Sequence, residues 1–170
     1  KLITPEQFAT AVASFKGIVR RLDKKSDKTT VPIFEGFGSS YEKARSAIAA
    51  MKQHFPARRL IIIFEPHTFS WRNREALHWY DTVFAGAAKV FVYEPASQGA
   101  NTHQQSTQEE IVERITTSGI DTVAITNEQQ ALDVLRTKLD ENDCVLLLTS
   151  GDLGGLIESI PKLAERKFPQ

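Results

Sequence analysis

Two short runs in the sequence place cations, a carboxylate and an imidazole where strands are expected to end. They are Gly17-Ile18-Val19-Arg20-Arg21-Leu22 and Phe64-Glu65-Pro66-His67. An arginine on a strand that faces a cleft can bind a phosphate through two parallel hydrogen bonds. A histidine at a strand end can exchange hydrogen bonds with a ligand. Because α/β proteins keep their ligand contacts at strand ends, both runs are candidates for an anion-binding site.

Each candidate also has a plainer interpretation. Side chains alternate along a strand, so one of Arg20 and Arg21 can face a cleft while the other meets solvent, and pairing with Asp23 or Asp27 fits the same pattern. An isolated histidine such as His67 is usually a surface residue. The other histidines are His54, His78 and His103. They are not spaced with Asp, Glu or Cys as in a metal site, so the sequence predicts no metal ligands.

Two further loops follow predicted strands, and each carries a carboxylate. They are Tyr93-Glu94-Pro95-Ala96 and Ser150-Gly151-Asp152-Leu153-Gly154-Gly155. From spacing alone, ordinary loop solvation or helix capping is the favoured interpretation of Glu94 and of Asp152. The glycine-rich turn lacks the lysine of a phosphate-binding P-loop.

The elements that position these residues alternate between strands and helices. The first half predicts a helix capped by Thr4 and Gln7 that ends at Gly17, a hairpin of strands 18–22 and 31–34, a helix capped by Ser39 and Glu42, and a buried strand over 60–64. Pro32 favours an edge position for the second strand. The second half first predicts a helix over 71–84, strand 90–93 and a long polar loop over 94–105. A helix capped by Ser106 and Glu109 follows and ends at Gly119. The last predicted elements are strand 122–125, a helix from Asn127, strand 144–148 and a helix to about Lys167. This order predicts an α/β fold, a three-layer Rossmann-like open sheet of about six mostly parallel strands with helices on both faces.

Composition restricts the classes of partner. A chain of 170 residues that is 41% hydrophobic suits a single domain over residues 1–170. Lysine plus arginine and aspartate plus glutamate both total 21, so we expect no nucleic-acid or membrane partner. No apolar run reaches the length of a membrane span, and the single cysteine, Cys144, lies in an apolar strand; both are consistent with a cytoplasmic protein.

Taken in order, the motifs resemble the C-terminal domain of the Mur ligases, the ATP-dependent enzymes that add amino acids or peptides to UDP-N-acetylmuramate. In that family, the arginine of a Gly-x-x-x-Arg run approaches the nucleotide phosphates, and Arg21 holds this place. The run from Ile33 to Ser40 lies where the alanine-adding and tripeptide-adding relatives carry Asp-Asp-Tyr-Ala-His-His-Pro. The aspartate that meets the ribose falls on Gly36, so Glu35 is the remaining candidate for that contact.

The resemblance extends to the later loops. Phe64-Glu65-Pro66-His67 matches the family's Phe-Gln/Glu-Pro run, which is followed by His or Arg, and this adds His67 to the implied nucleotide site. Arg72 suits the tripeptide-adding pattern. The loops that hold Glu94 and Asp152 lie toward the incoming amino component in the relatives. The resemblance thus implies nucleotide binding by Arg21, Glu35 and His67, substrate binding by Arg72, Glu94 and Asp152, and no catalytic residue within this domain alone.

For a whole enzyme, the resemblance implies an N-terminal UDP-sugar domain and a central ATPase domain, with ATP and Mg²⁺ as cofactors and most metal ligands outside this chain. The implied reaction joins L-alanyl-γ-D-glutamyl-meso-diaminopimelate to UDP-N-acetylmuramate, and we expect the chain to be an excised, inactive lid domain. Two alternatives remain. One is the UDP-N-acetylmuramate–L-alanine ligase domain, and the other is a non-catalytic nucleotide-binding or interaction module, since fold alone does not define function.

Overall fold

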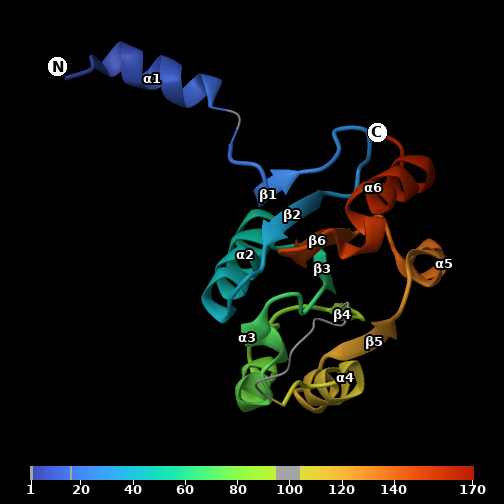
Figure 1. The fold of residues 1–170 in the computed structure, drawn as a ribbon. Helices are drawn as coiled ribbons and strands as arrows, with labels where there is room; N and C mark the ends of the chain where they lie inside the picture. Colours follow the sequence, from blue (N-terminus) through green and yellow to red (C-terminus); the bar gives the residue numbers. More distant parts are fainter. Residues whose placement is uncertain (1, 16, 95–103) are drawn as a thin grey trace.

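The chain folds around a single twisted sheet, seen in the computed structural model, which describes residues 2–15, 17–94 and 104–170 (Figure 1). The strand order is β1-β2-β6-β3-β4-β5. Only β1 runs antiparallel to its neighbour, β2, and the other adjacent strands are parallel. The strands are β1 (Arg21–Lys24), β2 (Ile33–Phe37), β3 (Arg59–Phe64), β4 (Lys89–Tyr93), β5 (Asp121–Ile125) and β6 (Asp143–Thr149). The predicted α/β architecture is confirmed.

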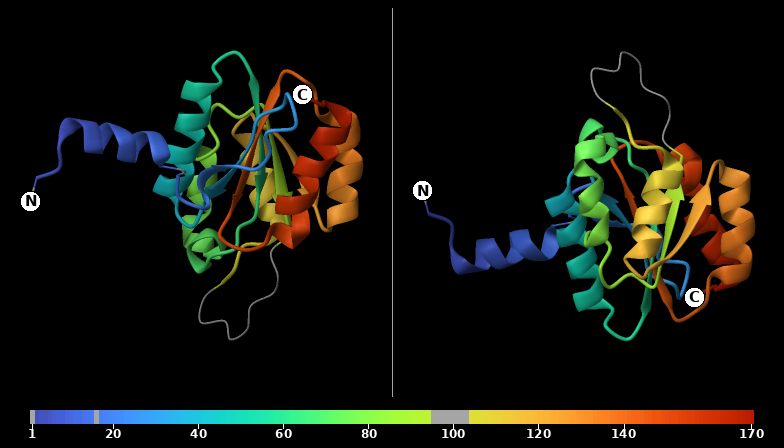
Figure 2. Two further views of the ribbon diagram at one scale, coloured as in Figure 1. Left: turned by 90° about the horizontal axis from the view of Figure 1, so that it is seen from above. Right: turned by 90° about the horizontal axis from the view of Figure 1, so that it is seen from below.

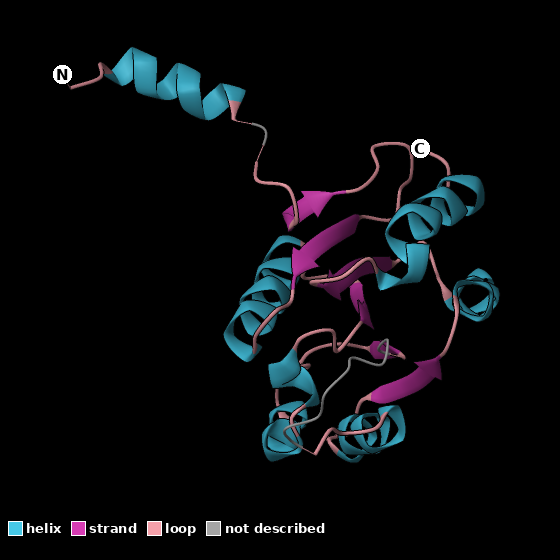
Figure 3. Cartoon of the chain, viewed as in Figure 1, coloured by secondary structure: helices cyan, strands magenta, loops and turns pink. Residues whose placement is uncertain are grey.

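Helices cover both faces of the sheet (Figures 2 and 3). One face is covered by α2 (Tyr41–His54), α3 (Phe69–Arg72), the 3₁₀ helix η1 (Arg74–Asp81) and α4 (Gln108–Thr117). The other face is covered by α5 (Glu128–Lys138) and α6 (Leu156–Lys167), with the short 3₁₀ turn η2 (Leu153–Gly155) before α6. No helix within the described ranges combines the length and the apolar character needed to span a bilayer.

The central strands are apolar throughout because both of their faces are buried. In β6, Leu146 and Leu148 pack in the core on the α2 side, while Val145 and Leu147 pack in the core on the α6 side. This alternation is the geometric consequence of a strand whose successive side chains point in opposite directions. Each fully buried side chain of this size contributes about 1.5–3 kcal/mol of hydrophobic stabilisation.

The position of β6 in the sheet determines where a ligand site can form. It is the last strand in the sequence, yet it lies between β2 and β3. The helices that follow β2 and β3 cover one face, whereas α6 follows β6 on the other face. The loops after these strands therefore diverge at the carboxyl edge of the sheet, which is where ligands bind in open α/β sheets.

Helix α1 (Pro5–Ser14) projects from the body of the domain (Figures 1 and 2). The predicted capping box of Thr4 and Gln7 is confirmed, and the helix ends with Phe15 as its C-cap, two residues before Gly17. None of its residues is buried, and its apolar side chains are exposed, Phe8 by 59% and Val12 by 58%.

The hairpin prediction is confirmed, but two of its details were wrong. Strand β1 begins at Arg21 because Arg20 and Leu22 have positive φ values of 62° and 55°, which interrupt regular pairing before Asp23. Pro32 does not place β2 at an edge. It lies one residue before the strand, and its carbonyl still accepts a hydrogen bond of 2.8 Å from the Val145 N–H.

The predicted helix over 71–84 is interrupted. Asn73 adopts an extended conformation (φ −64°, ψ 122°) between α3 and η1, and its side chain accepts a hydrogen bond from Glu75 N. Two predicted caps are off by one residue, since Ser40 and Thr107 are the N-caps of α2 and α4. Of the predicted loop over 94–105, residues 95–103 lie outside the described residues.

Candidate functional site

A buried carboxylate stands at the centre of the carboxyl edge. Glu65 follows β3 directly and is 4% exposed. Its side chain accepts hydrogen bonds from the Thr149 hydroxyl at the end of β6 and from the Leu153 N–H at 3.3 Å. The Nδ1 atom of His67 lies 3.3 Å from its other oxygen. Glu65 thus contacts the end of β6, the loop after β6 and His67.

A second buried carboxylate, Glu35 on β2, is 3% exposed and sits between two cations. Arg20 Nε donates to it at 2.7 Å, and Lys25 Nζ donates at 3.1 Å. A buried carboxylate without such partners would be strongly destabilising, so the two cations account for its burial. The Arg20 guanidinium also donates to the carbonyl oxygen of Gly151.

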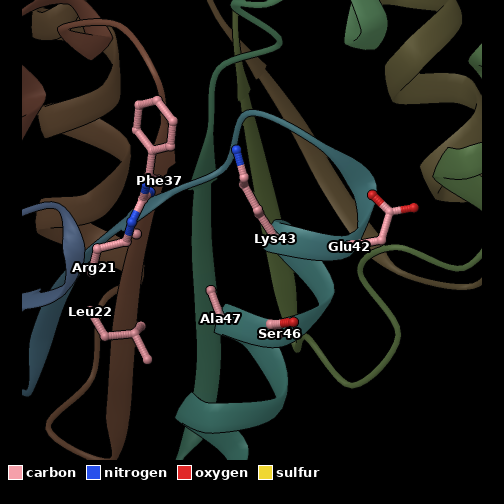
Figure 4. Close-up of a pocket in the computed structure, with 8 residues that line it drawn as sticks. Arg21, Leu22, Phe37, Glu42, Lys43, Ser46 and Ala47 are labelled. Carbon is pink, nitrogen blue, oxygen red and sulfur yellow. The ribbon is translucent and has the colours of Figure 1, made fainter.

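Arg21, the first residue of β1, lines a cavity of about 430 Å³ between β2 and α2 (Figure 4). Its guanidinium carbon lies 4.6 Å from the centre of the Phe37 ring, and Lys43 Nζ of α2 lies 5.3 Å from the same ring. The remaining walls are mainly apolar or small: Leu22, Gly36, Glu42, Ser46 and Ala47. The guanidinium carbon of Arg20 lies 5.7 Å from the ring as well. Cations beside a half-buried aromatic ring favour a flat, negatively charged ligand.

Gly36 has no room for a larger side chain. A Cβ atom at this position would lie 3.2 Å from Leu146 Cδ1 and 3.4 Å from Ala47 Cβ. The position that carries an aspartate in the resembled family thus points into the apolar layer under α2. An aspartate here would require the neighbouring side chains to move.

Carboxylates also gather around Tyr93, at the end of β4. Burial raises the pKa of Tyr93, and the charges of Glu65, Asp152, Glu128 and Glu94 raise it further. Asp152 in addition accepts a hydrogen bond of 3.1 Å from Gly154 N, within the turn before α6. A Cβ atom on Gly154 would lie 2.0 Å from the Tyr93 hydroxyl, so the turn is pressed against the tyrosine. This side of the edge has negative potential and suits a cationic group.

The six residues predicted from the sequence fall in different places. The charges of Glu94 and Asp152 both raise the pKa of Tyr93. The charge of Glu65, the carboxylate that His67 contacts, raises it as well. Arg21 lines the separate cavity, and Glu35 is held by Arg20 and Lys25. Arg72 is 3% exposed, at the end of α3.

Several residues of the edge were not among the predicted site residues. Glu65 and Thr149 each follow a long apolar run, so their place at a strand end was visible in the sequence. Arg20 was recognised as a strand arginine, but the sequence left open whether it or Arg21 faces a cleft. Lys43 and Phe37 gave no signal, because their contacts depend on the position of α2. No group of three or more His, Cys, Asp or Glu side chains that could hold a metal ion is found in the described part of the chain.

Close packing at Gly151 gives a test of this arrangement. A Cβ atom there would lie 2.6 Å from His67 Nδ1 and 2.7 Å from Glu65 Oε2. We expect Gly151→Ala to destabilise the domain by about 1–3 kcal/mol, because overpacking forces these groups apart. The measurement is a thermal melt, in which about 2–4 °C of Tm is lost per kcal/mol for a domain of this size.

The matched variant is Gly151→Ala combined with His67→Ala, which removes one of the two colliding groups. It should recover part of the lost Tm relative to the single variant. An unchanged Tm in Gly151→Ala would show that the loop does not press on Glu65 and His67.

Comparisons with known proteins agree with the fold and the motifs. A sequence model of the family "Mur ligase, glutamate ligase domain" matches residues 20–151. UDP-N-acetylmuramate–L-alanine ligase of Nitrosomonas eutropha is 26% identical over 171 residues, which cover 95% of this chain and 36% of the relative. The same ligase of Geobacter sulfurreducens is 28% identical over 148 residues, with 86% of this chain and 32% of the relative covered. The chain thus spans about a third of the length of these relatives.

Solved structures give the same result for the fold. The murein peptide ligase of Psychrobacter arcticus superposes with a TM-score of 0.71 at 18% identity, over 92% of this chain and 32% of that one. A single domain of a putative UDP-N-acetylmuramate:L-alanyl-γ-D-glutamyl-meso-diaminopimelate ligase from Haemophilus ducreyi superposes with a TM-score of 0.63 at 17% identity. That match covers 85% of this chain and all of the other. Because the family match extends over most of the chain, from β1 to the loop after β6, this chain belongs to the Mur ligase family as its C-terminal, glutamate ligase domain.

Proposed function

We propose that the chain is one domain of a longer ATP-dependent ligase that joins L-alanyl-γ-D-glutamyl-meso-diaminopimelate to UDP-N-acetylmuramate in the cytoplasm. In this proposal the domain binds the incoming peptide and part of the nucleotide, and the N-terminal and central domains of the same chain supply the UDP-sugar site and the remaining ATP site. The domain acts as a lid that closes over them.

The observation that carries the proposal is the arrangement at the end of β4. Glu94 follows Tyr93 directly in the chain, the turn that carries Asp152 packs against the Tyr93 hydroxyl, and Glu65 with His67 packs against Gly151 of the same loop. A ligase of this kind must hold the ammonium end of the amino component at a defined place. Carboxylates at a strand end attract an ammonium group, and the neutral Tyr93 hydroxyl can hydrogen-bond with it once it has lost a proton. Arg72 is proposed as the partner of a peptide carboxylate; it is buried in this structure.

The cavity beside Arg21 supports binding of the nucleotide. Phe37 offers a flat apolar surface, and Arg21 and Lys43 offer positive charge beside it. ATP would supply the phosphoryl group that activates the acid, and Mg²⁺ would be held mostly by the other domains. Glu35 is proposed only as an indirect contributor to this site, since its carboxylate is held by Arg20 and Lys25. His67 would approach the phosphates from the β3 side.

The second candidate is ligation of L-alanine instead of the peptide. The curated relatives named above are UDP-N-acetylmuramate–L-alanine ligases, which favours it. The two candidates share the nucleotide and the UDP-sugar and differ only in the amino component.

The proposal predicts that this chain alone turns over no ATP and forms no amide bond, because no phosphate-binding P-loop is present in its sequence. The measurement is release of phosphate from ATP, with UDP-N-acetylmuramate and each amine present, by this chain and by the full-length protein. The full-length protein should form the amide product with at least one of the amines. Turnover by the isolated chain, or no product from the full-length protein, would contradict the proposal.

A further inference from the structure

Arg20 has a left-handed backbone conformation, which is unusual for a residue other than glycine. It has a φ of 62°, and Leu22 has a φ of 55°, while Arg21 between them belongs to β1. A residue with a Cβ atom in this left-handed region costs about 1–2 kcal/mol. Both guanidinium carbons lie near the Phe37 ring, Arg21 at 4.6 Å and Arg20 at 5.7 Å from its centre. The two arginines differ in their partners, because Arg21 lines the cavity and Arg20 pairs with the buried Glu35.

The Arg20 side chain joins two segments that are far apart in the sequence. Its Nε donates to Glu35 Oε1 on β2, and its terminal nitrogen donates to the carbonyl oxygen of Gly151 in the loop after β6. The Arg20 side chain is about one third exposed, while the Glu35 side chain that it contacts is buried. Lys25 shares the contact with Glu35, whereas the contact with the Gly151 carbonyl oxygen comes from Arg20.

The loop held by Arg20 is the same loop that carries Asp152. On its other side, Gly151 N donates to the Thr149 hydroxyl, which in turn donates to Glu65. The Leu153 N–H donates to Glu65 as well, and Leu153 is fully buried despite a φ of 54°. The loop is thus fixed between Arg20 on one side and Glu65 with His67 on the other.

We propose that Arg20 is a positioning residue: its guanidinium clamps the loop from Ser150 to Gly155 onto Glu65 and so sets the place of Asp152 and His67. The clamp is a property of this chain and does not depend on a ligand. Only its consequence for catalysis, through Asp152 and the amino component, rests on the proposed function.

The proposal requires an arginine and not merely a cation. The planar guanidinium offers several N–H groups in a fixed fork, so it can serve a carboxylate and a carbonyl oxygen together. A lysine would keep a positive charge beside Glu35, which preserves the folded state. Its single ammonium nitrogen lies at the end of a flexible stem and would not hold both partners in the same geometry.

The test is hydrogen exchange of backbone amides in Arg20→Lys, compared with the unchanged chain and with Arg21→Lys. We expect the amides of Gly151, Leu153, Gly154 and Gly155 to exchange about 10-fold faster in Arg20→Lys, since a tenfold change corresponds to about 1.4 kcal/mol, in the range of one hydrogen bond. Amides of β3 and β6 should keep their protection. Arg21→Lys changes the neighbouring arginine in the same way and should leave the loop amides unchanged.

Equal protection of the loop in Arg20→Lys and in the unchanged chain would overturn the clamp. Faster exchange in both lysine variants would overturn it too, because the effect would then not be specific to Arg20. If Arg20→Lys does not fold, Glu35→Gln serves in its place: it keeps the shape of the side chain, removes the charge that holds the guanidinium, and should loosen the same four amides. Unchanged exchange of these amides in Glu35→Gln would likewise overturn the clamp.

A second readout separates the clamp from the proposed function. In the full-length ligase, Arg20→Lys should raise KM for the amino component about 10-fold, and should raise KM for ATP less, because the loop carries Asp152 while Arg21 and Lys43 remain at the nucleotide cavity. Loose loop amides together with an unchanged KM for the amino component would confine Arg20 to a structural role and reject its positioning role. An unmodified full-length protein without ligase activity would reject the proposed function, while the exchange result would still decide the clamp.

Discussion

Arg21→Met should lower kcat/KM for ATP in the full-length ligase by about 100-fold, with little effect on the stability of this domain. Hydrogen bonds to charged groups contribute about 1.5–3 kcal/mol, which corresponds to about 10-fold to 150-fold in a rate constant. Methionine keeps an unbranched stem that can pack on the Phe37 ring, so the variant removes mainly the charge. Arg21 is exposed, and the lost cation–π contact should cost only about 0.5–1 kcal/mol of stability.

The measurement is the steady-state rate against ATP concentration, together with a thermal melt. The matched control is Arg136→Met on α5, an exposed arginine that forms an ion pair of 2.6 Å with Asp133 and lies on the other face of the sheet. It should leave both kcat/KM and Tm nearly unchanged. A large loss of Tm in Arg21→Met, or an unchanged kcat/KM for ATP, would show that Arg21 supports the fold and not the nucleotide.

The sequence predicts the core of this fold well because the relevant signals are local. The apolar run at Leu60–Phe64 indicates a strand buried on both faces, and the structure buries every one of its residues. Thr4 and Gln7 predict a helix start from two side chains three residues apart, and their reciprocal hydrogen bonds are present. Such features depend only on neighbours within one turn or one strand.

The errors occur where distant segments decide the conformation. The helical pattern after Trp71 gives no sign of a break, yet Asn73 forms an isolated β-bridge with Gln105, more than thirty residues away. The start of β1 moves to Arg21 because Arg20 turns aside to reach Glu35 and Gly151. Neither contact can be seen in hydrophobic periodicity, which reports burial and not pairing.

The same reason explains which parts of the candidate site could be predicted. Glu94 and Asp152 were found because each follows a strand, and strand ends share one edge in a parallel sheet. That Glu65 would meet Thr149 depends on β6 lying next to β3, an order that the sequence does not specify. The resemblance to the ligases suggested Arg21, but it could not show that Arg20, unlike Arg21, would pair with Glu35 and with the Gly151 carbonyl oxygen.

The full-length ligase should prefer L-alanyl-γ-D-glutamyl-meso-diaminopimelate to L-alanine by about 100-fold in kcat/KM, or about 2.8 kcal/mol. Both amines present the same reacting group, so the difference must come from the remainder of the peptide. Binding energy from remote parts of a substrate can lower the barrier at the reacting centre, and L-alanine has no remote part to contribute. The loop after Tyr93, the turn at Asp152 and Arg72 are the groups proposed to supply it.

The charge of the two carboxylates can be tested without loss of their hydrogen bonds. Asp152→Asn keeps an oxygen that can accept from Gly154 N, and Glu94→Gln keeps the length of an exposed side chain. Each should raise KM for the tripeptide by about 10-fold, the size expected for one partly exposed ammonium–carboxylate contact. Glu113→Gln, an exposed glutamate on α4, is the control and should have no effect on KM.

The ratio of kcat/KM for the two amines separates the two proposed substrates, because it measures discrimination in the transition state. A clear preference for L-alanine would reject the tripeptide and retain the ligase, with the carboxylates still acting on the shared ammonium group. If neither amine is ligated but the domain still binds ATP, the chain is a nucleotide-binding module. In that case the close packing around Gly36, which leaves no room for an aspartate, would be the structural reason to look for a different use of the Arg21 cavity.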